Sequence, residues 1–176
     1  MIKLTRGFTL IELLITLVIV SILVAMALPS YQRYQLKKDR AVAQQEALKI
    51  ANELERFKAK NFSYKGFNPN FLYNTTGVTN YDASKGELSL PLGAGTADVK
   101  YILTLVDPST KKPLTETSAA GMNWAISVQR ASGNGGLKQP QNYDLLINSA
   151  GVRCMTNATG QVSTLVSCGD KTESWS

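Results

Sequence analysis

One carboxylate, Glu12, lies inside an otherwise uncharged apolar run that extends from Phe8 to Leu28. A charge in a segment of this length costs about 2.5–3.5 kcal/mol or more at the centre of a bilayer, so such residues usually serve a function and have a partner. A free amine would be a suitable partner for Glu12. A cut between Gly7 and Phe8 would produce one, at the new end of the chain. The pattern therefore indicates that Glu12 is used in a contact between apolar helices.

The residues around the proposed cut carry a resemblance. The sequence from Arg6 to Leu13 reads Arg-Gly-Phe-Thr-Leu-Ile-Glu-Leu, and it resembles the prepilin leader of type IV pilins and type II secretion pseudopilins. In that family a membrane aspartyl peptidase cuts after the Gly and methylates the new N-terminal Phe. The resemblance implies that Gly7 and Phe8 flank the cleaved bond, that Phe8 is N-methylated, and that Glu12 is the assembly residue.

Three other interpretations compete for this N-terminus. An ordinary secretory signal could be cleaved after Ala25-Met26-Ala27, but its apolar region would exceed the usual 7–15 residues and would contain Glu12. A plain membrane anchor is possible, because the run is close to the roughly 20 residues that span a bilayer. A buried core helix is disfavoured, since a chain of this size seldom holds an all-apolar helix of such length.

Positive charge is concentrated directly after the apolar run. The chain carries a net charge of +6, and residues 33–65 contain nine basic and four acidic residues, a net of +5. Residues 66–176 contain eight of each and are neutral overall. The first basic residues of this segment could contact anionic headgroups, at about 1 kcal/mol each, or lie on a solvated helix face; they are Arg33, Lys37, Lys38 and Arg40. DNA is possible but not favoured, because a DNA-binding domain usually shows a clustered basic face.

Apolar residues recur at helical spacing after Pro29. They lie at Ala43, Ala47, Ile50, Ala51, Leu54 and Phe57, with polar and charged residues between them. This stripe predicts an amphipathic helix over residues 29–60 that packs on a sheet. Pro29 removes a backbone donor and is expected to kink the helix. As one rod, residues 8–60 would extend for about 80 Å.

The remainder of the chain has the character of loops and short strands. Residues 61–84 predict a long loop rich in Asn, Gly and aromatic residues. Strands are expected at 88–92, 99–106, 124–130, 143–148 and 152–155, with alternating burial in 124–130 and a Gly-rich turn at 132–136. Short strands with close turns and no second long helix predict an α+β fold, in which the helix covers an antiparallel meander.

The resemblance implies the same architecture, the type IV pilin fold. It divides the chain into a leader (1–7), a transmembrane and assembly helix (8–28), an amphipathic helix (29–60) and a globular sheet domain with a C-terminal disulfide region (61–176). Residues 142–154 additionally resemble the C-terminal region of PilE-type minor pilins.

The two cysteines, Cys154 and Cys168, are expected to form a disulfide, because the leader implies export to an oxidising compartment. Closing a loop of this length stabilises a fold by roughly 3 kcal/mol. A metal site would need more ligands, and a catalytic thiol would lack its usual His base, since the chain contains no His. No motif of nucleophilic, phosphate-binding or zinc catalysis occurs. We expect no enzyme activity, cofactor or metal.

The sequence thus favours a type IV pilus subunit, most like a minor pilin that helps to initiate or cap assembly. A major pilin or a secretion pseudopilin is the nearer alternative, and an adhesin or DNA-binding subunit the second. Expected partners are other pilin subunits, the prepilin peptidase, the inner-membrane assembly machinery and inner-membrane lipid. The positive-inside rule alone does not fix the orientation. The resemblance implies a single-pass inner-membrane protein with a periplasmic domain, and surface pili after assembly.

Overall fold

A computed structural model describes residues 8–73 and 80–175. The chain forms two compact units, Met1–Lys37 and Lys38–Ser176, here called the N-terminal unit and the head. Helix α1 (Leu10–Asn61) contributes residues to both. The expected fold class is confirmed: a long N-terminal helix, apolar in its first half, and an antiparallel sheet on which its second half packs.

The N-terminal unit is helical from Leu10 onward, and α1 continues through Pro29 without interruption. Every residue from Phe8 to Tyr34 is exposed. Its most apolar window has a mean hydropathy of 2.8, so the helix is long and apolar enough to cross a membrane, judged by length and composition alone. The kink at Pro29 stays a prediction.

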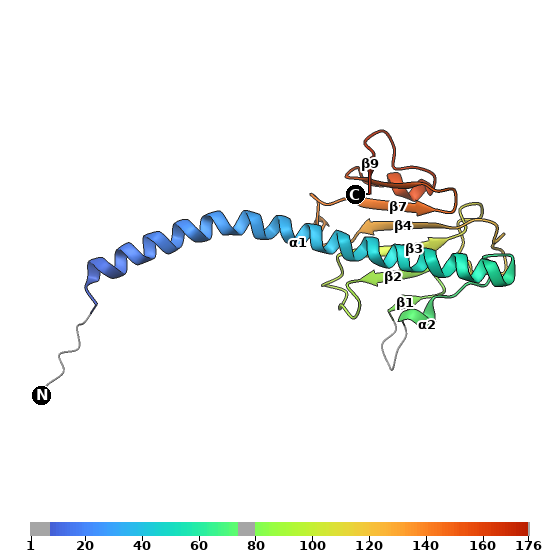
Figure 1. Ribbon diagram of the computed structural model, residues 1–176, viewed down its shortest axis with the longest axis horizontal. Coiled ribbons are helices and arrows are strands. Elements are labelled where there is room, and N and C mark those ends of the chain that lie inside the picture. Colours follow the sequence, from blue (N-terminus) through green and yellow to red (C-terminus); the bar gives the residue numbers. More distant parts are fainter. Residues whose placement is uncertain (1–7, 74–79, 176) are drawn as a thin grey trace, which may run out of the picture. The chain divides into compact units, whose positions relative to one another are not determined.

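The head contains a seven-stranded antiparallel sheet whose strands follow one another in chain order (Figure 1). Its order is β1 (Tyr81–Asp82), β2 (Glu87–Leu90), β3 (Tyr101–Val106), β4 (Ala125–Arg130), β7 (Asp144–Asn148), β8 (Arg153–Thr156) and β9 (Glu173–Ser174). A separate hairpin, β5 (Ser132–Gly133) and β6 (Gly136–Leu137), is inserted between β4 and β7. The expected meander is confirmed.

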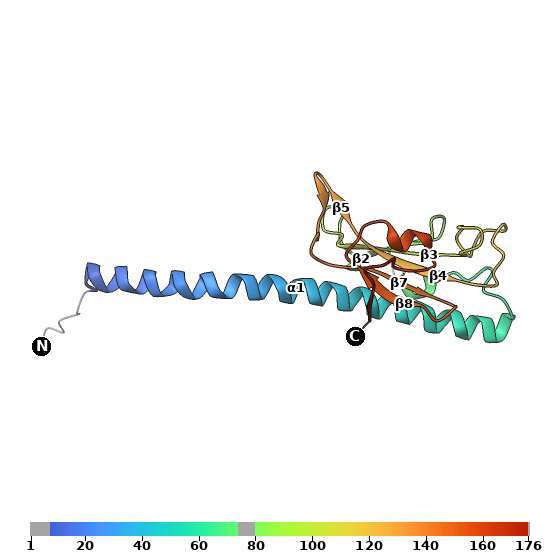
Figure 2. The same ribbon diagram turned by 90° about the horizontal axis from the view of Figure 1, so that it is seen from above.

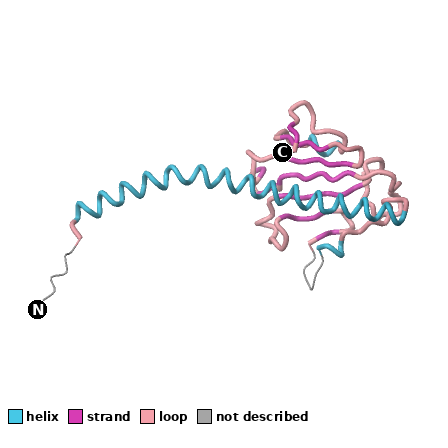
Figure 3. Tube along the Cα trace, viewed as in Figure 1, coloured by secondary structure: helices cyan, strands magenta, loops and turns pink. Residues whose placement is uncertain are grey.

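The head portion of α1 lies across one face of the sheet (Figures 1 and 3). Ala43 and Ala47 let the helix approach closely, and Ile50 and Leu54 complete its buried stripe. They share one core cluster with sheet residues that include Leu103, Leu105, Ile126, Leu145 and Ile147. The sequence periodicity therefore identified the covering face of the helix correctly.

The opposite face of the sheet is covered by the C-terminal region. Leu146, which alternates with the helix-facing Leu145 and Ile147, packs in a second cluster with Val162 of the short helix η1 (Gln161–Thr164) and with the two cysteines. Figure 2 views this arrangement of sheet, α1 and C-terminal segments from above. Strand β4 consequently buries four consecutive residues, Ala125 to Val128. The alternating burial expected for residues 124–130 is wrong, because both faces of this strand are covered.

Other boundaries also differ from the expectation. The predicted loop 61–84 contains a one-turn helix, α2 (Asn70–Tyr73), and strand β1. The Gly-rich turn at 132–136 is the β5–β6 hairpin, and the tail forms β9. These elements have two to four residues each, too few to produce a recognisable period.

Candidate assembly and binding sites

Helix α1 begins with a side-chain cap. The Thr9 hydroxyl accepts a hydrogen bond from the Glu12 backbone N–H at 3.3 Å, so Thr9 is the N-cap and Glu12 the third helical residue. Thr-x-x-Glu is the pattern of a capping box, and a carboxylate in the first turn also interacts favourably with the helix dipole. Among the described residues the Glu12 carboxylate does not complete the box, so its contribution to this helix end is the interaction with the dipole.

The other polar side chains of the apolar segment are satisfied within the helix. The Thr16 hydroxyl donates to the Leu13 carbonyl at 2.8 Å, and the Ser21 hydroxyl donates to the Val18 carbonyl at 2.7 Å. Within residues 8–73 and 80–175, the carboxylate of Glu12 has no hydrogen bond or ion pair from its side chain. Glu12 is thus the side chain of this segment whose charge has no partner within the described residues.

The predicted cleavage bond lies at the edge of the described chain. Phe8 precedes the helix and is 75% exposed, whereas Gly7 lies outside the described residues. The roles of Gly7 and Phe8 in cleavage and of Phe8 in methylation remain predictions.

The predicted disulfide is present between Cys154 of β8 and Cys168, whose Cα atoms are 6.0 Å apart. It holds the segment with η1 against the sheet. The tail returns beside it: Cys154 pairs with Ser174 of β9, and the Trp175 indole N–H donates to the Cys154 carbonyl at 2.7 Å. Disulfide, indole and strand together fix the C-terminal edge of the head.

A buried ion pair organises the segment before β7. Arg130 Nε lies 2.9 Å from Asp144 Oδ1, and both side chains are buried. The guanidinium also donates to the carbonyls of Pro140, Asn142 and Asn157. Its donors are matched in a planar fork that a lysine could not reproduce. This network is structural, and it could not be predicted from the sequence because most acceptors of the guanidinium are backbone carbonyls.

The acidic residues of α1 in the head are turned toward partners. Glu55 Oε1 accepts hydrogen bonds from the Tyr64 hydroxyl at 2.9 Å and the Trp124 indole at 3.1 Å. Glu46 accepts from the Tyr73 hydroxyl at 2.8 Å; burial, and next this bond, raise the pKa of Tyr73 above its usual range. Asp39 accepts from Gln139, and Glu53 pairs with Arg56. Basic residues of α1 face the head as well, since Arg40, Lys49 and Lys58 lie over the rings of Tyr143, Tyr73 and Tyr64.

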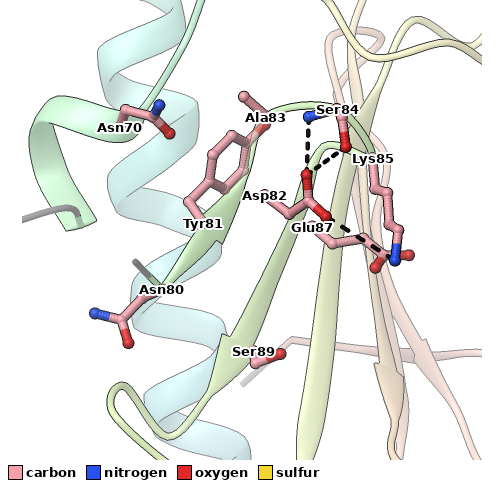
Figure 4. Close-up of a pocket in the computed structure, with 9 residues that line it drawn as sticks. All are labelled: Asn70, Asn80, Tyr81, Asp82, Ala83, Ser84, Lys85, Glu87 and Ser89. Carbon is pink, nitrogen blue, oxygen red and sulfur yellow. Dashed lines mark hydrogen bonds and ion pairs between the residues drawn. The ribbon is translucent and has the colours of Figure 1, made fainter. Parts of the chain in front are cut away.

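A polar cleft of about 640 Å³ opens beside β1 and β2 (Figure 4). Asp82 accepts hydrogen bonds from the Ser84 hydroxyl and backbone N–H, and Lys85 Nζ lies 3.9 Å away. The bond from Ser84 holds the pKa of Asp82 below its usual value. The Ser84 hydroxyl donates to a carboxylate with no His to act as base, so this geometry does not activate a nucleophile. Among the described residues, no group of His, Cys, Asp and Glu could hold a metal ion.

Two successive segments of the chain match two family models. Residues 2–28 match the prokaryotic N-terminal methylation motif. Residues 29–113 match the family described as type IV minor pilin ComP, DNA uptake sequence receptor. The chain is related to type IV pilins. Its α+β architecture is the type IV pilin fold, as the sequence predicted.

Curated relatives agree with this relationship. Two fimbrial proteins of Pseudomonas aeruginosa are each 35% identical to the chain over 100 residues, which is 56% of this chain. The matched region spans 60% of the length of these relatives. No solved structure matches the chain. The pilin family models end at Pro113, so β4 to β9 and the disulfide lie beyond both of them.

Proposed function

We propose that this chain is a minor subunit of a type IV pilus. The observation that carries the proposal is the carboxylate of Glu12, which lacks a partner among the described residues and lies on an exposed apolar helix, within the residues that match the methylation motif. The ComP model is described as a minor pilin, which favours this function over a major pilin or a secretion pseudopilin. The proposed role is structural rather than catalytic, with no cofactor or metal.

Charge pairing supplies the mechanism of assembly. Before assembly, the subunit lies in the inner membrane with its head on the outer side. Cleavage after Gly7 gives Phe8 a free amine, which methylation leaves cationic. In a bundle of apolar helices, Glu12 of an incoming subunit pairs with this amine of its neighbour. A buried ion without a partner costs several kcal/mol, so pairing selects one axial register.

Apolar packing completes the contact. The exposed large residues of the first turns of α1 would be buried by neighbouring helices in the filament; they are Leu10, Ile11, Leu13, Leu14, Leu17 and Val18. Burial contributes about 1.5–3 kcal/mol for each such side chain. This term drives association but has no direction, whereas the Glu12 pair sets the alignment.

The test separates the charge of Glu12 from its position in the helix cap. Glu12→Gln removes the charge but retains a residue that suits a capping box. We expect normal processing and a fall of about 100-fold in the amount of the chain in sheared filaments, from an unpaired ion worth about 3 kcal/mol. The amount is measured by quantitative mass spectrometry against the total chain in the membrane.

Thr9→Ala is the matched control, because it removes the cap acceptor and leaves the charge. Loss of an N-cap costs about 1 kcal/mol of helix stability, so incorporation should change little. Equal losses in Thr9→Ala and Glu12→Gln would assign Glu12 to the cap and contradict the pairing mechanism.

DNA capture is a second candidate function, favoured by the description of the ComP family as a DNA uptake sequence receptor. The net charge of residues 66–176 is zero, which argues against DNA binding by that region. A net charge of zero does not describe how the charges are distributed over the surface. The basic excess of residues 33–65 lies on a helix whose acids in the head are already paired. Phosphate contacts from such a helix would give binding that falls steeply with salt.

An electrophoretic shift with the full chain in detergent micelles tests this candidate. Double-stranded DNA of different sequences is titrated across a salt series. A complex that depends on sequence and weakens with salt supports DNA capture. A salt-sensitive complex without sequence preference would be ordinary attraction of a basic helix, and it would exclude a receptor function.

A further inference from the structure

Phe62 has a backbone conformation that its side chain disfavours. Helix α1 ends at Asn61, and Phe62 follows with φ of 59°, in the left-handed region. Its N–H donates to the Lys58 carbonyl at 2.7 Å, the bond of an αL helix terminus. This position is usually taken by Gly, or by Asn, because a Cβ is crowded there. A bulky aromatic residue in this region is an outlier.

The head offers Phe62 no compensating contact. Its side chain is 89% exposed, although Phe57 and Phe67 pack edge-to-face close by with ring centroids 5.5 Å apart. Leu165, another left-handed residue, is 6% exposed and packs in a small core cluster. Single exposed apolar residues are ordinary, but here the burial of the side chain does not offset the cost of the backbone conformation. Such outliers point to function.

A second exposed apolar side chain lies on a segment that is bonded to the residues directly after Phe62. Met122 is 69% exposed and follows Gly121. The Gly121 carbonyl accepts hydrogen bonds from the Tyr64 N–H at 2.8 Å and the Ser63 hydroxyl at 3.1 Å. The Gly121 N–H donates to buried Asp107 at 2.7 Å. The two chain segments that carry Phe62 and Met122 are therefore held together, and we call these two exposed side chains the Phe62–Met122 patch.

The charge around this patch indicates its partner. Residues 56–66 carry four basic and no acidic residues. Lys65 lies directly against Gly121, where an added Cβ would meet it at 2.5 Å. A second copy docked patch to patch would bring like charges together. A phosphate backbone would match the lysines but would not remove water from Phe62 and Met122. An apolar pocket with an acidic rim matches both features.

We propose that the Phe62–Met122 patch docks into an acidic-rimmed apolar pocket on a different pilin subunit. This inference rests on the proposed function, since the partner is a neighbour in the filament. The chain would then bind a subunit of a different sequence. The strained backbone at the end of α1 would hold the Phe62 ring exposed for this contact.

Phe62→Asn separates folding from docking, because Asn tolerates the left-handed conformation. We expect the Tm of the full chain in detergent to stay the same or to rise by about 2–4 °C, as relief of strain predicts. We also expect the amount of the chain in sheared filaments to fall by about tenfold or more, the factor that corresponds to 1.4 kcal/mol. Phe71→Asn removes another exposed ring, 63% exposed on α2, and should change neither quantity in this way.

Cross-linking then identifies the partner. A photo-reactive benzoyl-phenylalanine at position 62 of the full chain is irradiated in intact cells, and the product is sequenced by mass spectrometry. Attachment to another subunit with a methylation motif and an acidic contact segment supports the proposal. Attachment to a second copy, or to DNA, overturns it. So does normal incorporation of Phe62→Asn. Absence of the wild-type chain from filaments would instead contradict the proposed function.

Discussion

The N-terminal unit and the head differ in whether their apolar side chains are exposed or buried. In the N-terminal unit the apolar residues from Phe8 to Leu28 are exposed, and Glu12 lacks a partner in the described chain. In the head the apolar residues fill one large core and two small ones, and a single buried side-chain atom among the described residues, Asn70 Oδ1, has no hydrogen bond. The head is thus complete as a fold. The N-terminal unit requires a surrounding of lipid or of other helices.

The comparison predicts that variants of the two regions affect different measurements. Glu12→Gln should have the largest effect on incorporation into filaments and leave the Tm of the full chain in detergent unchanged, because no residue of the described head depends on Glu12. Variants of buried head groups should lower the Tm and leave cleavage after Gly7 intact. A large fall in the Tm of Glu12→Gln would break the comparison.

Within the head, the largest loss of stability is expected for Arg130→Ala. It leaves Asp144 buried without its cation and removes the donor from three carbonyls. Removing one member of a buried pair costs about 3–5 kcal/mol, which lowers the Tm by about 10 °C for a domain of this size. Thermal unfolding followed by circular dichroism measures the change.

Arg130→Lys is the matched control for this prediction. It retains the charge but loses the fork geometry, so its Tm should lie between those of the wild type and Arg130→Ala. If Arg130→Lys equalled the wild type, the hydrogen bonds to Pro140, Asn142 and Asn157 would contribute nothing and the network would be a simple charge pair.

A smaller loss is expected when the disulfide is removed by combining Cys154→Ser with Cys168→Ser. The bond closes a loop with a sequence separation of 14, and its loss should destabilise the head by about 3 kcal/mol. Hydrogen exchange should rise in η1 and β9, which depend on this segment, before it rises in β3. A uniform increase across the sheet would show that the C-terminal region is not a separate layer.

The smallest effect is expected for Asp107→Asn, together with a change in pH dependence. Burial opposes ionisation of Asp107, but hydrogen bonds from the Gly121 and Ser109 backbones outweigh it and hold the pKa of Asp107 below its usual value. Folding therefore favours the carboxylate. Its contribution is complete above the unfolded-state pKa of about 3.9 and is lost as the pH falls through the folded-state pKa.

Asp107→Asn should cost about 1–3 kcal/mol at neutral pH, the range for a buried hydrogen-bonding group left unsatisfied. The difference in Tm between the wild type and Asp107→Asn should shrink as the pH falls from 5 toward 2. A difference that stays constant over this range would contradict the assignment of the lowered pKa to Asp107.

Much of this architecture could be predicted from the sequence, because its causes are repetitive or specific. The apolar stripe from Ala43 to Leu54 predicted the buried face of α1, and a chain with two cysteines allows one pairing. The β4 burial pattern could not be predicted, since it depends on the C-terminal region folding over the far face of the sheet. Strand β9 could not be predicted either, because two polar residues are too few to show a periodic pattern. The adjacent Trp175 holds this strand in place through its bond to the Cys154 carbonyl.

The sites divide in the same way. Glu12 was recognisable because a charge is expensive in an apolar run that enters a bilayer. The cap at Thr9 could have been predicted from the Thr-x-x-Glu spacing. The left-handed conformation of Phe62 could not be predicted. Such a conformation at a helix end is usually indicated by Gly, and a Phe at this position predicts that the conformation is absent.

Quantitative mass spectrometry of filaments sheared from the native cell would decide whether this chain is a minor pilus subunit. We expect a trace amount of this chain beside an abundant different pilin, with an N-terminal peptide that begins at methylated Phe8. Dominant abundance would make the chain the main filament protein and contradict a minor role. Absence from the filaments, with the processed chain still in the envelope, would contradict a pilus subunit and favour a secretion pseudopilin.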